Sequence, residues 1–319
     1  MLRSTMGFDW RRSPAHLLLL SKFRNPRPLD DFSKSDTWEL VLGEAPGKAV
    51  ERFVDEGLLE QASLEGLLDY KYKISELKSM LERRGLPVSG RKAELIERLS
   101  RADPEGMTKT TRGLNVLRCT EQGQMIAEEY LAQEKKERTQ AEEQVLQALQ
   151  QRKFKEAGQI VAAFEARQVF PRGFNIDWKH YSPTNDVAML KTMFGGRPKI
   201  LSSLDDQQME YLRIAAGMIY LWGTNQADDW LPNNFETGLI MDNDAAARTV
   251  FFYASHQLNV AQYRAAGAKT VEILATDNSC DACKKLAKRK YKLDEVPELP
   301  YEKCTSEVGC RCTTVVADF

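Results

Sequence analysis

The chain has 319 residues, 45 Lys and Arg, 46 Asp and Glu, and a formal net charge of −1. This length suits two or three domains, and the near-neutral balance excludes a protein that coats nucleic acid along its whole surface. The apolar run at residues 17–20 is too short for the core of a signal peptide, and no segment is long enough to cross a bilayer. We therefore expect a soluble cytoplasmic protein without a membrane partner.

The start of the chain passes from an irregular lead-in to helical patterns. Residues 1–35 mix Pro, Arg and Asp without strong periodicity, which predicts an N-terminal arm. Residues 36–66 carry short apolar helical patterns. They open the first domain, which we place at residues 36–131.

Residues 74–99 predict a helix, a tight loop and a second helix. Apolar residues recur at helical spacing on both predicted helices: Ile74, Leu77, Leu81, Leu95, Ile96 and Leu99. We expect Gly85 to follow the first helix with a positive φ and Ser89 to cap the second. The two helices should therefore share a small apolar core.

This segment is strongly basic. Residues 71–101 hold nine Lys and Arg against four Glu, a local charge of +5. The Ser89–Lys92 turn places backbone N–H groups and two cations at a helix start, and Gly90 lets an anion approach the backbone. A nucleic-acid phosphate is the natural occupant. The candidate nucleic-acid-binding residues are Arg83, Arg84, Ser89, Gly90, Arg91, Lys92 and Arg98.

The same segment resembles the SAP motif, a small helix–loop–helix module. The matching residues are Leu77, Leu81, Gly85, Leu86, Ser89, Gly90, Lys92, Leu95, Ile96, Arg98 and Leu99. The resemblance implies DNA binding with weak sequence preference, and RNA is a further possible partner. A basic helical hairpin used only for packing or protein contact is the alternative.

Residues 116–131 read as a strand followed by an amphipathic helix. This resembles the strand-to-helix tail of winged-helix proteins, with Cys119 standing where that pattern has Leu, directly before Thr120. The resemblance implies that residues 40–131 form one compact unit with the SAP helices inside it. We interpret Cys119 as a buried small apolar residue.

The middle of the chain is helical. Residues 132–172 predict a helical hairpin or linker that turns near Arg152 and Lys153. Residues 173–319 form the last domain, with helices expected at residues 201–222 and 243–266, the second ending at Gly267. The predicted fold class is mainly α, with a small β zinc-ribbon-like tail at residues 268–319.

That tail holds five of the six cysteines, and without a secretion signal they favour metal ligands over disulfides. The candidate ligands are Cys280, Cys283, Cys304, Cys310 and Cys312. A Cys-x-x-Cys pair and a second group about 20 residues later suit a structural Zn²⁺ site. Five thiols compete for four positions; we favour Cys280, Cys283 and Cys310, with Cys304 or Cys312 as the fourth. Reduced thiols or a redox dithiol remain alternatives.

Next to the pair lies the basic run KKLAKRK at residues 284–290. It is a second candidate surface for phosphate groups. A solvated face without a partner is the alternative.

Residues 245–316 also resemble the C-terminal part of phage head-morphogenesis proteins of the MuF-like minor capsid family. The matching residues are Gly267, Asp277, Cys280, Cys283, Leu286, Leu299, Pro300, Cys310, Arg311 and Cys312. The chain departs from the family at residues 307–309, where Glu-Val-Gly replaces His-Pro-Asn, and Cys304 is a candidate substitute ligand. The resemblance implies an all-thiolate metal site, and a portal or capsid subunit as partner in a virion.

Taken together, these patterns predict a non-enzymatic DNA-binding protein, bacterial or prophage-derived, with a structural zinc tail. A phage minor-capsid-like structural protein is the first alternative. A DNA-processing enzyme is the second, but paired carboxylates with a His or Lys at a suitable spacing are missing from the sequence, as is a phosphate-cradling loop.

Overall fold

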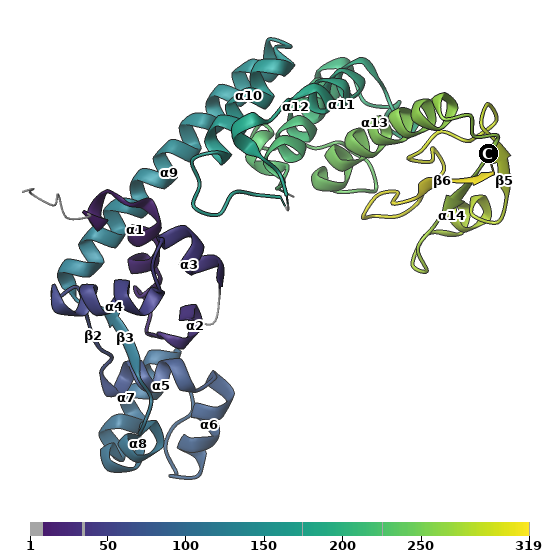
Figure 1. Ribbon diagram of the computed structural model, residues 1–319. Helices are drawn as coiled ribbons and strands as arrows, with labels where there is room; N and C mark the ends of the chain where they lie inside the picture. Colours follow the sequence, from purple (N-terminus) through teal and green to yellow (C-terminus); the bar gives the residue numbers. More distant parts are fainter. Residues whose placement is uncertain (1–8, 34–35, 174, 225, 319) are drawn as a thin grey trace, which may run out of the picture. The chain divides into compact units, whose positions relative to one another are not determined.

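The computed structural model describes residues 9–33, 36–173, 175–224 and 226–318 (Figure 1). The predicted mainly α fold class is confirmed, because helices dominate and the strands form two small sheets. The chain divides into two compact units, residues 1–137 and 138–319, so the division falls inside one long helix. No helix in the described ranges combines the length and apolar character needed to span a bilayer.

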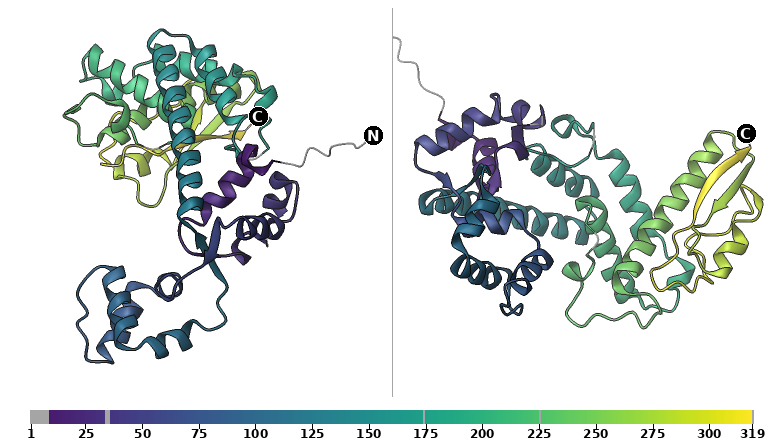
Figure 2. Two further views of the ribbon diagram at one scale, coloured as in Figure 1. Left: turned by 90° about the vertical axis from the view of Figure 1, so that its left-hand side faces the viewer. Right: turned by 90° about the horizontal axis from the view of Figure 1, so that it is seen from below.

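Unit 1 combines short helices with a three-stranded antiparallel sheet in the order β1-β3-β2. Its elements are η1 (Trp10–Arg12), α1 (Pro14–Lys22), β1 (Arg27–Pro28), α2 (Asp30–Ser33), α3 (Asp36–Leu42), α4 (Pro46–Asp55), β2 (Leu59–Gln61), α5 (Leu64–Lys71), α6 (Ile74–Glu82), α7 (Lys92–Ala102), α8 (Pro104–Thr111), β3 (Val116–Cys119) and the first half of α9 (Glu121–Gln150). Helices α5–α8 follow β2 and precede β3, and they form a lobe that the views show extending from the sheet (Figures 1 and 2).

The lead-in is part of the core of unit 1. Leu19, Leu20 and Phe23 are fully buried, and the Trp10 ring packs edge-on against Phe53 at 4.9 Å between centroids. The predicted arm is therefore wrong for residues 10–33, where short helices pack against α4. Residues 1–8 lie outside the described part of the chain.

The helices of the lobe have a core of their own. Its buried side chains are Leu68, Leu77, Met80, Leu81, Leu95, Ile96, Leu99 and Met107. The expected positive φ of Gly85 is confirmed at +65°. Ile74, expected in this core, is exposed, and Met80 of the same helix is buried instead.

The expected strand-to-helix step at residues 116–131 is present as β3 and α9. Thr120 Oγ1 accepts a hydrogen bond from Gly123 N at 3.2 Å and donates one to Gly57 O at 2.8 Å, which ties the start of α9 to the end of α4. Cys119 is half-buried, and burial raises the pKa of its thiol to about 11. The winged-helix resemblance itself stays a prediction.

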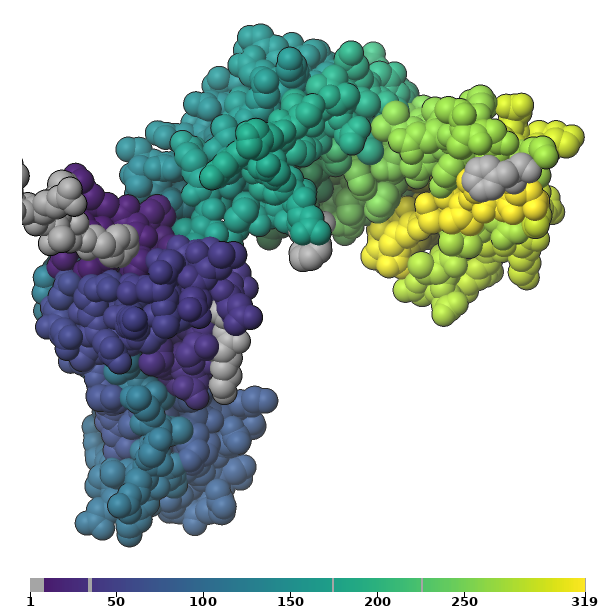
Figure 3. Space-filling model, in the orientation of Figure 1, coloured from purple at the N-terminus to yellow at the C-terminus, as the bar shows by residue number. Residues whose placement is uncertain are grey.

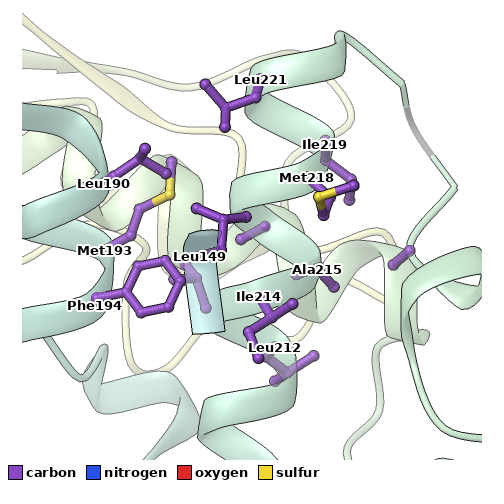
Figure 4. Packing of buried hydrophobic residues seen from close by; sticks show 14 of the residues in the cluster. Leu149, Leu190, Met193, Phe194, Leu212, Ile214, Ala215, Met218, Ile219 and Leu221 are labelled. Atoms are coloured by element: carbon purple, nitrogen blue, oxygen red, sulfur yellow. The ribbon is translucent and has the colours of Figure 1, made fainter. Parts of the chain in front are cut away.

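Unit 2 contains a helical core and a small β tail. Its elements are the second half of α9, α10 (Phe154–Glu165), η2 (Trp178–His180), α11 (Thr184–Gly195), η3 (Lys199–Leu201), α12 (Asp206–Trp222), η4 (Asp228–Trp230), α13 (Asn243–Ala265), β4 (Thr270–Leu274), α14 (Asp281–Leu286), β5 (Lys290–Lys292) and β6 (Thr313–Asp318). The expected hairpin turn lies between α9 and α10, where Arg152 has φ +59°. Figure 4 shows Leu149 of α9 among buried side chains of α11 and α12.

The tail begins where α13 ends, next to Gly267 with φ +80°. Its sheet is antiparallel in the order β5-β4-β6, with β4 at its centre, and it provides the β structure expected in this tail. The Tyr263 hydroxyl donates to Thr314 O at 3.0 Å, which connects α13 to β6. The long helix therefore supports the sheet that carries the cysteines.

Candidate nucleic-acid interface and metal centre

The lobe of α5–α8, residues 64–111, is held at both ends by the pairing of β2 with β3. Gln61 lies opposite Leu117 in the register, and Ala62 N donates to Val116 O at 2.9 Å. Across the same pair of strands Arg118 contacts Glu60 at 2.7 Å. Figure 3 shows the lobe as one continuous body of side chains. We call it the SAP lobe below, for the motif its sequence resembles.

The loop between α6 and α7 differs from expectation at the start of α7. The N-cap is Arg91, not Ser89, and Glu94 Oε2 accepts a hydrogen bond from Arg91 N at 3.2 Å. Gly90 has φ +123°, and a Cβ there would overlap the Glu94 carboxylate. Gly90 thus makes room for the capping side chain. The backbone anion site expected at this helix start already holds the carboxylate of Glu94.

Three of the candidate cations are engaged in contacts with other residues of the protein. Arg84 pairs with Asp103 at 2.6 Å, and Lys92 lies 3.1 Å from a carboxylate oxygen of Asp69. Hydrogen bonding to Arg84, together with the Gly106 N–H, holds the pKa of Asp103 below its usual value. Arg98 Nη1 donates to two loop carbonyls, those of Pro87 at 2.5 Å and Ser89 at 3.1 Å. These side chains stabilise the lobe.

Arg83 and Arg91 are the two exposed candidate cations without a described ion pair or a described hydrogen bond from the guanidinium Nη atoms. Arg83 uses only its Nε, which donates to Ser79 O at 3.3 Å. Within the described ranges, no carboxylate lies within 4.0 Å of either guanidinium. Lys73 and Lys78, absent from the candidate set, are also exposed without a described ion pair. In the sequence, these two lysines contribute only to the local excess of positive charge. That excess does not show which cations have a carboxylate partner in the fold.

The five tail cysteines converge in unit 2. Cys280 and Cys283 lie at the start of α14, Cys304 and Cys310 lie in the loop before β6, and Cys312 immediately precedes β6. All five are free thiols, and all but Cys280 are buried. Two groups have all their sulfurs within 4.8 Å of one another: Cys280, Cys283 and Cys304, and Cys283, Cys310 and Cys312. The structure therefore brings the five sulfurs together in two overlapping groups that share Cys283.

Two sulfur–sulfur distances match those of a tetrahedral metal site. Cys280 Sγ lies 3.8 Å from Cys304 Sγ, and Cys283 Sγ lies 3.7 Å from Cys310 Sγ. Four thiolates at the usual zinc–sulfur distance of about 2.3 Å lie about 3.8 Å apart, whereas a disulfide needs about 2.05 Å. The cluster therefore has the donor set and the spacing to hold a metal ion.

Hydrogen bonds within the cluster favour the thiolate of Cys310 at the expense of its neighbours, because contact with Cys310 and burial raise the pKa of Cys283, Cys304 and Cys312. Cys283, Cys304 and Cys312 all hydrogen-bond to Cys310 and hold the pKa of its thiol well below the usual range. Burial acts to raise the pKa of Cys280, but the backbone N–H groups of Thr305 and Cys283 outweigh it and lower that pKa to about 7. Cys280 and Cys310 are thus the sulfurs that supply thiolate, the form that binds metal, and the raised pKa values of Cys283, Cys304 and Cys312 mean that a metal ion would have to displace their protons.

A further titratable side chain lies close enough to the thiol cluster to interact electrostatically with Cys310. His256 is buried on α13, and burial lowers its pKa. It does not belong to either group of potential ligands among the described residues.

Comparison with known proteins bears on the lobe alone. Residues 71–104 match the SAP domain family, a segment that runs from the last residue of α5 to the first of α8. No curated protein and no solved structure matches the chain. The MuF-like resemblance of the tail stays a prediction. The SAP resemblance is confirmed, and a SAP domain suggests DNA binding by this lobe.

Proposed function

We propose that the protein binds DNA without catalysing a reaction on it, by contacts between the SAP lobe and the phosphate backbone. The SAP match at residues 71–104 is the observation that carries this proposal. Arg83 and Arg91 supply the contacts, because their guanidinium groups have no carboxylate partner among the described residues. Contacts to phosphate carry little sequence information, so we expect weak sequence preference.

A salt-varied titration of the full chain tests the proposal. Each phosphate contact contributes about 0.9 to the slope of log K against log salt on duplex DNA. The variant Arg83→Gln/Arg91→Gln should lower this slope by about 2 and weaken binding at every salt concentration. The matched control is Lys135→Gln/Lys136→Gln, which removes the same charge from the exposed face of α9. An unchanged slope and affinity in the Arg variant contradicts the proposal.

The tail holds a structural zinc ion in this proposal. The contacts Cys280–Cys304, at 3.8 Å, and Cys283–Cys310, at 3.7 Å, involve four different residues, and we assign these four as ligands. A closed set of four thiolates leaves no open position for water, so the ion serves folding. Purified protein should contain one zinc ion per chain.

Single Cys→Ser variants identify the ligands. Zinc content should fall in each of the four ligand variants and stay at one in Cys312→Ser. Cys119→Ser is the control outside the cluster. If Cys312→Ser loses zinc and Cys304→Ser keeps it, the fourth ligand is Cys312 and not Cys304.

A role as a phage minor-capsid-like structural protein is the second candidate. One observation favours it: the tail has the order of features that the MuF-like pattern requires, namely a helix ending at Gly267, strand β4, the cysteine pair at α14 and the Leu299–Pro300 turn. Portal and terminase genes beside the coding sequence would support this candidate. Under it, the SAP lobe would contact packaged DNA.

A further inference from the structure

A second set of exposed cations lies on unit 2, beside the thiol cluster. It comprises Lys284, Lys285, Lys288 and Arg289, at the end of α14 and in the turn that follows, and we call it the α14 basic surface. Residues 281–292 carry six Lys and Arg against one Asp, a local charge of +5. The local excess thus equals that of the SAP segment in fewer than half as many residues.

These four cations differ from their neighbours in having no described partner. Lys290 lies 3.5 Å from Asp318 and 3.8 Å from Glu272, and Lys292 lies 3.4 Å from Glu295. In the described ranges, no carboxylate lies within 4.0 Å of the side-chain nitrogens of the α14 basic surface. Their charge is therefore not neutralised within the protein.

The backbone beneath these cations is fixed from both sides. Cys283, buried in the thiol cluster, anchors α14, and the Tyr291 hydroxyl of β5 donates to Leu286 O at 3.1 Å. Strand β5 is in turn paired with β4. A rigid backbone lowers the entropy lost when the surface binds a partner.

The surroundings favour a polyanion as that partner. The exposed large apolar side chains of the described chain include none between residues 284 and 292, so the surface lacks the apolar component that membrane binding needs. Four adjacent cations without fixed acidic partners instead suit a row of phosphates.

We infer that the α14 basic surface is a second phosphate-backbone contact for nucleic acid, located on a different unit from the SAP lobe. The inference rests on the proposed function. Two weak contacts on one chain act together, because binding at one raises the effective concentration of the other. Each contact also adds its own counterion release to the salt dependence.

The experiment is a salt titration of the full zinc-containing chain with a labelled DNA duplex of mixed sequence. The variant Lys284→Gln/Lys285→Gln/Lys288→Gln/Arg289→Gln should lower the log–log slope by about 1 for each side chain that binds a phosphate in the wild type, up to about 4. Lys290→Gln/Lys292→Gln is the control from the same tail, since both residues already have carboxylate partners, and it removes the same charge as Lys288→Gln/Arg289→Gln. Its slope should change by less than that of the fourfold variant.

The outcomes separate this inference from the proposed function. If the Arg83/Arg91 variant loses slope and the fourfold variant does not, the inference is overturned and the proposed function stands. If neither variant changes binding, both are overturned. A zinc ion with four thiolate ligands carries a net charge of about −2. The competing explanation is that the cations offset this charge and thereby stabilise metal binding. If the fourfold variant loses zinc, the double variant Lys288→Gln/Arg289→Gln, whose residues lie outside α14, replaces it in the salt titration. A lower log–log slope in this double variant supports the inference, and an unchanged slope overturns it.

Discussion

Arg98 lies among the cations of the SAP lobe, but its guanidinium is directed at the protein. It donates to the carbonyls of Pro87 and Ser89, which belong to the loop that carries Arg91. Sequence reasoning grouped Arg98 with Arg91, because both belong to the same charge excess and motif. The partners of Arg98, like Asp103 for Arg84, are set by tertiary contacts that charge counting does not reveal. Residue type was therefore predictable and residue role was not.

Replacing Arg98 tests this division of roles. Arg98→Gln should lower the free energy of unfolding of the SAP lobe by about 1 kcal/mol, since it removes two hydrogen bonds to loop carbonyls. The salt slope of DNA binding should stay within error of wild type, because the charge removed does not face phosphate. Chemical denaturation and the salt titration measure the two effects. A slope reduced by about 1 would place Arg98 on the DNA instead.

Glu44 makes the stability of unit 1 depend on pH. Its hydrogen bonds with Arg52, at 2.8 and 3.0 Å, outweigh burial and, together with His16, lower its pKa from the usual 4.5. A lowered carboxyl pKa in the folded state stabilises the protein above the unfolded value, and this stabilisation is lost as pH falls below 4.5 through the folded value. Thermal unfolding of Glu44→Gln should show lower stability at neutral pH and a smaller further loss below pH 4.5.

At the scale of elements, helices with strong apolar periodicity were the predictable part. The pattern over residues 74–99 located α6 and α7, since every turn of each helix repeats the signal. It misplaced the cap of α7, because Gly90 at φ +123° lets Glu94 fold back onto Arg91 N. The lead-in was missed because α1 and α2 are short, and their burial against α4 depends on contacts distant in sequence.

At the junction of β3 and α9, position 123 has no room for a side chain larger than that of glycine. A Cβ at this position would overlap the carbonyl oxygen of Leu58, which also accepts a backbone hydrogen bond from Thr120 N at 2.9 Å. Gly123→Ala should therefore cost about 1–3 kcal/mol of unfolding free energy through overpacking. Gly195→Ala in α11 is the control, because no atom lies within 4 Å of the added Cβ. Helix propensity alone favours Ala over Gly, so a Gly123→Ala variant as stable as the wild type would show that the contact with Leu58 relaxes at no cost.

For the whole molecule, the two units should respond differently to loss of metal. The thiol cluster has a small core of its own, formed mainly by the cysteines, Ile273 and Leu299. Under the zinc proposal, the ion supplies much of the folding energy of residues 268–319. A strong chelator should expose the amides of this segment to hydrogen exchange and leave those of α6 and α7 protected. Loss of protection throughout the chain would show that the units fold as one.

The position of the SAP lobe between β2 and β3 has an evolutionary consequence. Both ends of the lobe meet at one pair of strands, and its core is separate from the rest of unit 1. A tight Asn-Gly hairpin in place of residues 63–115 would reconnect the strands in register. The SAP lobe is therefore a segment that evolution can insert or delete as a whole while the rest of unit 1 keeps its fold.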